Sequence, residues 1–107
     1  MKLKLTAALL AMGASMSAAH AAYNALVLAN ELGNVLAAEE LCGLTFDQPA
    51  IAAFIEKRVP ADDMSFAGFL QMQVDGIRMG FADMSASQKT AHCTQIRRVA
   101  KSYGFLN

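Results

Sequence analysis

The sequence predicts an all-α protein: a small four-helix bundle, with one short helix, stapled by one disulfide and preceded by a cleaved signal peptide. Apolar residues recur at helical spacing in four segments, each bounded by a cap, a proline or a glycine. No segment after residue 21 alternates polar and apolar residues between hairpin turns, as a strand would. Two cysteines, 51 residues apart, can join the first segment to the last.

The first 21 residues have the three parts of a signal peptide. A basic start is followed by an apolar stretch from Leu5 to Met12, and small residues then lead to Ala19-His20-Ala21. Small residues flank the bond that signal peptidase cuts. The apolar stretch is shorter than the run of about 20 residues that a membrane-spanning helix needs. We therefore expect cleavage before Ala22 and a periplasmic or secreted bacterial protein.

The chain after the signal is expected to form a single domain over residues 22–107. Seven of the nine basic residues lie in it, against all nine acidic residues, which gives a net charge of −2. Its length suits one modest core. It holds no second apolar run long enough to cross a bilayer, so we expect no transmembrane segment after cleavage.

The first expected helix runs from about Tyr23 to Leu41. Its apolar residues recur at helical spacing, while Asn30 and Glu31 fall on the opposite side. Gly43 follows, and glycine is the usual residue just past a helix end. The core positions predicted for this helix are Ala25, Leu28, Ala29, Leu32, Val35 and Leu36.

The second expected helix is short, from Gln48 to Arg58. Asp47 is a good N-cap, and a proline in the first turn is tolerated. Two basic residues suit the negative C-terminal end of the helix. Pro60 ends it, because the residue before a proline avoids the helical conformation. The apolar stripe of this helix consists of Ile51, Phe54 and Ile55.

The third expected helix runs from Met64 to Asp83, with Asp62 or Asp63 as its cap. It has the strongest helical periodicity in the chain, carried by Phe66, Leu70, Val74, Ile77 and Phe81. Gly76 and Gly80 lie one turn apart on this helix. We expect these glycines to let a neighbouring helix of the bundle pack closely, and a homodimer contact is the alternative.

The fourth expected helix starts at Ser85 and ends at Gly104. The spacing Ser85-x-x-Gln88 is a capping box, in which each residue bonds the backbone of the other. Its inner face is predicted to consist of Cys93, Ile96, Val99, Ala100 and Tyr103.

Cys42 and Cys93 are the only cysteines. An oxidising compartment would pair them, and their separation excludes a C-x-x-C redox motif. Closing a loop of this length contributes about 4 kcal/mol to stability when the effect is treated as chain entropy. We therefore expect a structural disulfide between the first and fourth helices.

The basic residues after Met84 form a candidate interaction face. Lys89, Arg97, Arg98 and Lys101 lie in a segment that has no acidic residue. Such a face suits an acidic partner, an anionic lipid surface or a phosphate-bearing ligand. The alternative, which we favour, is an ordinary solvated face that complements the acidic remainder of the domain. Four bases on one helix of a net-acidic protein do not predict nucleic-acid binding.

Met72 and Met79 form a candidate methionine face. They lie seven residues apart, on a side of the third helix that differs from its phenylalanine face. Flexible methionine side chains adapt to varied apolar partners. A copper(I) site with His92 is a rival interpretation, but the spacing lacks a close pair of methionines. We expect no metal site and no cofactor.

Catalysis is not expected. The serines after residue 21 have a single candidate base, His92, and none lies in a nucleophile motif. The adjacent acidic pairs Glu39-Glu40 and Asp62-Asp63 would diverge on a helix, as caps and surface residues do. The sequence thus favours a non-enzymatic protein.

A few short segments are similar to features of a known family. Cys42, the following Phe46-Asp47-Gln48-Pro49 and the later Cys93-Thr94-Gln95 give a plan that resembles the periplasmic acid-stress chaperones of the HdeA type. The resemblance implies a small disulfide-bonded helical domain that protects other proteins. The chain departs from that family in its higher methionine content and its lack of a long lysine-rich tail.

The function hypothesis that follows is a small exported helical binding or interaction protein, with envelope-stress or chaperone-like protection as one version. Its partner would be another protein of unknown identity, and a homodimer stays open. The alternatives are a periplasmic copper-handling protein and an inhibitor or accessory subunit of one specific partner.

Overall fold

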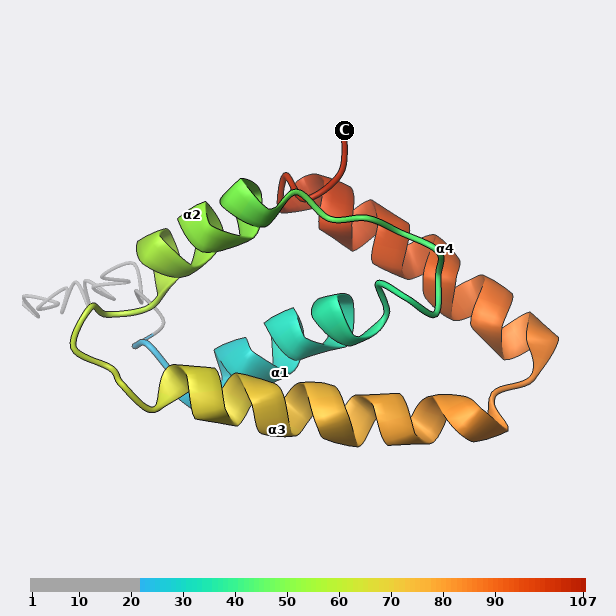
Figure 1. The fold of residues 1–107 in the computed structure, drawn as a ribbon, viewed down its shortest axis with the longest axis horizontal. Coiled ribbons are helices and arrows are strands. Elements are labelled where there is room, and N and C mark those ends of the chain that lie inside the picture. The colour runs from blue at the N-terminus through green and yellow to red at the C-terminus, as the bar shows by residue number, and fades with distance from the viewer. Residues whose placement is uncertain (1–21) are drawn as a thin grey trace, which may run out of the picture.

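The computed structural model describes residues 22–107 (Figure 1). The predicted signal peptide, residues 1–21, lies outside the described part of the chain. The helices are α1 (Ala25–Ala37), α2 (Gln48–Arg58), α3 (Phe66–Met79), the short 3-10 helix η1 (Gly80–Asp83) and α4 (Ala86–Ser102). Residues 22–107 contain no strand, and a disulfide joins Cys42 to Cys93, so the all-helical, disulfide-bonded prediction is confirmed.

Helix α1 has more buried residues than any other helix of the described chain. It packs lengthwise on α3 and also contacts α4, and Figure 1 shows it inside the outline formed by α2, α3 and α4. This arrangement is more open than four helices aligned side by side. The buried residues of α1 are Leu28, Ala29, Leu32, Gly33, Val35 and Ala37, which include four of the six core positions predicted for this segment.

Gly33 lies where α1 packs closely against α3. A Cβ added to it would lie 3.1 Å from the Cβ of Gln73 and 3.7 Å from the backbone nitrogen of Val74. The prediction that Gly76 and Gly80 serve close packing inside the bundle is wrong. Both are exposed, and a Cβ added to either would meet no atom within 4 Å.

Helix α1 ends at Ala37, earlier than the predicted Leu41, so the predicted limit is wrong. The chain then turns, with the Cys42 amide donating to the carbonyl of Ala38 at 2.9 Å and Gly43 at a φ of 63°. Ala38 is fully buried, which draws the turn inward and carries Cys42 to Cys93 on α4. Alanine and leucine continue the helical pattern through this segment, and the turn therefore leaves no mark in the spacing of apolar residues.

Helix α2 has the predicted bounds and the predicted cap, since the Asp47 carboxylate accepts from the Ala50 amide at 3.2 Å. No residue of α2 is fully buried. Phe54 anchors it, with its ring centroid 4.8 Å from that of Tyr103 and 5.6 Å from that of Phe105. Phe105 is completely buried, and its carbonyl accepts from the Asp47 amide at 2.9 Å. Sequence reasoning missed this core residue because it follows the last helix.

Helix α3 starts at Phe66, two residues later than predicted. Asp63 does not cap the helix itself, which corrects the predicted role. Its carboxylate accepts from the amide and the hydroxyl of Ser65, at 2.9 and 2.6 Å, and so stabilises the turn before the helix. At the other end the helix tightens into η1 after Met79, instead of continuing as an α-helix to Asp83.

Helix α4 follows the prediction closely. The capping box between Ser85 and Gln88 is present, with backbone-to-side-chain distances of 2.8 and 3.1 Å. Cys93, Ile96 and Ala100 are its buried residues. The helix ends at Ser102, and Gly104 takes a φ of 82°, a left-handed conformation that suits glycine.

Candidate functional site

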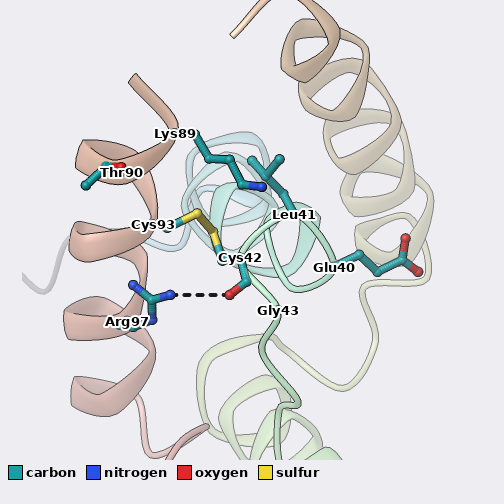
Figure 2. A pocket seen from close by; sticks show the side chains of 8 residues that line it. All are labelled: Glu40, Leu41, Cys42, Gly43, Lys89, Thr90, Cys93 and Arg97. Carbon is teal, nitrogen blue, oxygen red and sulfur yellow. Dashed lines mark hydrogen bonds between the residues drawn. A yellow bond between two sulfur atoms is a disulfide. The ribbon is translucent and has the colours of Figure 1, made fainter. Parts of the chain in front are cut away.

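A pocket of about 450 Å³ lies over the disulfide, between α4 and the turn that follows α1 (Figure 2). Lys89 and Arg97 reach into it from α4, on either side of the disulfide. The Arg97 guanidinium donates to the carbonyl of Cys42 at 3.4 Å. Glu40 also lines the pocket, so the pocket carries one acidic side chain beside the two basic ones.

The structure separates the four basic residues predicted as one face. Lys89 and Arg97 share the disulfide pocket. Arg98 points elsewhere, since its guanidinium donates to the side-chain oxygen of Gln95 at 3.2 Å, and Lys101 is exposed in the last turn of the helix. Only two of the four residues therefore come together.

An apolar cavity of about 400 Å³ lies at the corner between α2 and α3. Its polar side chains are the carboxylates of Glu56 and Asp63. Sequence reasoning missed it, because its residues come from two helices and from the loop around Pro60. The apolar side chains that line it belong to Ile55, Val59, Pro60, Ala61, Met64, Phe66 and Ala67.

Met64 extends beside this cavity and is 91% exposed. Met72 and Met79 are 71% and 79% exposed, on the side of α3 that faces away from α1. Soluble proteins rarely expose several large apolar side chains close together, unless these side chains bind a partner. Three exposed methionines on or beside α3 thus give this helix apolar side chains that can adapt to a partner.

Tyr23 connects the start of the domain to the cavity. Its hydroxyl donates to the Asp63 carboxylate at 2.7 Å. Partial burial first, and the neighbouring carboxylate second, raise the pKa of Tyr23 to about 12. Hydrogen bonds from Ser65 and then from Tyr23 hold the pKa of Asp63 below its ordinary value of 3.8. The Asp63 carboxylate, at the edge of an apolar cavity, therefore stays charged to more acid pH than an ordinary aspartate.

His92 is half-buried on α4, and its ring packs against Phe81 with 5.5 Å between centroids. Its Nε2 atom is buried without a hydrogen-bond partner. Phe81 belongs to the inner side of the α3–η1 segment, whereas Met72 and Met79 lie on the outer side. Among the described residues no three His, Cys, Asp or Glu side chains gather as a metal site would require.

No protein-family model, curated protein or solved structure matches this chain. None of the helices in residues 22–107 is long and apolar enough to cross a membrane. The disulfide pocket, the apolar cavity and the exposed methionines are therefore the features that can indicate a function.

Proposed function

We propose that this protein is a non-enzymatic, exported binding protein that holds apolar segments of other proteins in the cavity between α2 and α3. The observation that carries the proposal is the apolar cavity itself, about 400 Å³ in volume, with the highly exposed Met64 beside it. In this role the protein protects unfolded proteins from aggregation in the periplasm.

The size and lining of the cavity support an apolar ligand. A volume of this order lies within the range of small-molecule pockets and accommodates one or two large side chains. Ile55, Val59 and Phe66 provide apolar walls, and Met64 can adjust its three side-chain torsions to different occupants. Low specificity of this kind suits a protein that meets many unfolded chains.

The carboxylates support the same proposal. Glu56 and Asp63 lie at the cavity, and the bonds from Ser65 and Tyr23 lower the pKa of Asp63, so its carboxylate stays ionised to more acid pH than an ordinary aspartate. Charges beside an exposed apolar surface oppose self-association of that surface. They also favour client segments in which basic residues flank the apolar ones.

Export is part of the proposal. The signal-like residues 1–21 and a disulfide in the folded domain both suit an oxidising compartment. An accessory subunit of one specific partner would show the same features, but a cavity with adaptable methionine at its edge favours several clients over one.

The test is suppression of aggregation of heat-unfolded citrate synthase, followed by light scattering at neutral and acid pH. We expect the oxidised protein, residues 22–107, to suppress scattering, and Met64→Asp to lower the suppression at least about threefold, since a charge opposes apolar burial. Leu26→Asp is the matched control, because Leu26 is 55% exposed and lies outside the cavity. Absence of suppression at every pH, or equal loss in both variants, would contradict the proposal.

A further inference from the structure

Helix α3 has a second apolar face that nothing in the described chain covers. One side packs on α1 through Gln73, Val74 and Ile77, near Gly33. The opposite side presents Gly68, Met72, Asp75 and Met79, and all four are exposed. Their spacing of four, three and four residues produces a narrow straight stripe along the helix, as in the contact line of paired helices. We call these four residues the α3 seam.

The charges on α3 are arranged to complement a second copy of the same helix. Between Phe66 and Met79 the only charged residues are Asp75 and Arg78, which have opposite signs and lie three residues apart. A parallel pair of helices would place each charge beside its own kind. An antiparallel pair with its twofold axis between residues 76 and 77 places Asp75 of each copy opposite Arg78 of the other.

We propose that two copies of this chain associate through the α3 seam, with their α3 helices antiparallel and Asp75 of each paired with Arg78 of the other. The side chains of Met72 and Met79 are then buried in the same interface. Each half of the interface is identical, so the two ion pairs form together.

The neighbouring glycines provide room for this contact. Gly76 and Gly80 border the seam, and the space beside each is open, since an added Cβ would meet no atom within 4 Å. A glycine inside a helix costs up to about 1 kcal/mol relative to alanine. Close approach of the second copy, with a methionine over each glycine, offsets that cost.

The proposed dimer does not depend on the proposed function. The seam runs from Gly68 to Met79, whereas the apolar cavity uses residues 55–67 and opens at the corner between α2 and α3. A variant of Met64 therefore tests the cavity, and variants of Asp75 and Arg78 test the seam.

The experiment is sedimentation equilibrium of the oxidised protein, residues 22–107, from micromolar to millimolar concentration. We expect the wild-type protein to form dimers. Asp75→Arg and Arg78→Asp should each raise the dissociation constant at least about tenfold, because like charges then face each other twice across the twofold axis. Arg98→Asp is the matched control, as it makes the same charge change at an exposed helical arginine outside the seam.

Two further samples test whether the charges at positions 75 and 78 complement each other across the contact. The double variant Asp75→Arg/Arg78→Asp restores opposite charges. Its dissociation constant should lie within about threefold of that of the wild-type protein. An equimolar mixture of the two single variants should form a heterodimer although neither forms a homodimer. Circular dichroism of each variant verifies that the helices are intact, as expected for substitutions at exposed positions.

A wild-type protein that stays monomeric at millimolar concentration overturns the proposal. Dimers that are unaffected by Asp75→Arg, or that weaken equally with Arg98→Asp, show that another surface is used and also overturn it. A double variant that fails to dimerise overturns the antiparallel arrangement.

Discussion

The disulfide end of the molecule and the α2–α3 corner differ in how firmly they are held. At the disulfide end, Cys42 and Cys93 are bonded, and they belong to one buried cluster with Ile96, Ala100 and Phe105. At the corner, α2 has no fully buried residue and α3 has one, Phe66. We therefore expect this small domain to be held more firmly at the disulfide end than at the α2–α3 corner.

The largest expected effect concerns the disulfide. Reduction, or Cys42→Ser with Cys93→Ser, should lower the free energy of unfolding by about 4 kcal/mol, since the 51-residue loop is no longer closed in the unfolded chain. Urea unfolding of the oxidised and reduced protein, followed by circular dichroism, measures this loss. A loss below about 1 kcal/mol would mean that the disulfide end is not the source of stability.

The next effect compares two phenylalanines from the two regions. Phe105→Ala should lower the free energy of unfolding by about 3–4 kcal/mol, because Phe105 has no exposed surface and packs against Phe46, Phe54 and Tyr103. Phe69 on α3 is half-buried, so Phe69→Ala should lower the free energy of unfolding clearly less. Urea unfolding of both variants tests the comparison, and equal costs would remove the distinction between the two ends.

A pair of glycines gives effects of opposite sign. Gly33→Ala should destabilise the domain by about 1 kcal/mol, because the new methyl group would press on Gln73 at 3.1 Å. Gly76→Ala should stabilise it by about 0.5–1 kcal/mol, since the space is open and alanine favours a helix. Thermal melts at a concentration low enough to keep the protein monomeric measure both, and a common sign would contradict the packing described for α1 and α3.

The smallest effect is a pH dependence at the corner. The folded state lowers the pKa of Asp63 below 3.8, so this carboxylate adds stability above that pH, and the stability is lost as the pH falls through the folded pKa. Asp63→Asn should flatten the stability curve below pH 4 relative to the wild-type protein. Asp62→Asn is the matched control, and an identical change in both variants would show that the Tyr23–Asp63–Ser65 contacts are not responsible.

Local signals predicted most of the fold. The Asp47 cap with Pro60 defined α2, and the Ser85–Gln88 capping box defined the start of α4, because these interactions are complete within four residues of sequence. The spacing of apolar residues between Phe66 and Phe81 predicted α3, but it did not predict that the chain tightens into η1 after Met79. Phe105 and the turn at Ala38 escaped prediction because their burial depends on contacts with distant segments.

The candidate sites were less predictable for the same reason. The pairing of Lys89 with Arg97 over the disulfide requires the turn at Gly43, and the cavity requires two helices to meet around Pro60. Exposure of Met72 and Met79 agrees with their predicted position off the phenylalanine face. The glycines of α3 had two interpretations from sequence, and only the position of Gly33 opposite α3 shows which glycine serves the internal contact.

The most direct test of the binding role is NMR titration of the isotopically labelled, oxidised protein, residues 22–107, with an unfolded client. Reduced and carboxymethylated α-lactalbumin is a suitable probe, because it stays unfolded without added reductant. We expect the largest shift changes at Ile55, Val59, Met64 and Ala67, with little change at Lys89 and Arg97. Changes centred on the disulfide pocket, or no saturable change at any residue, would contradict the account.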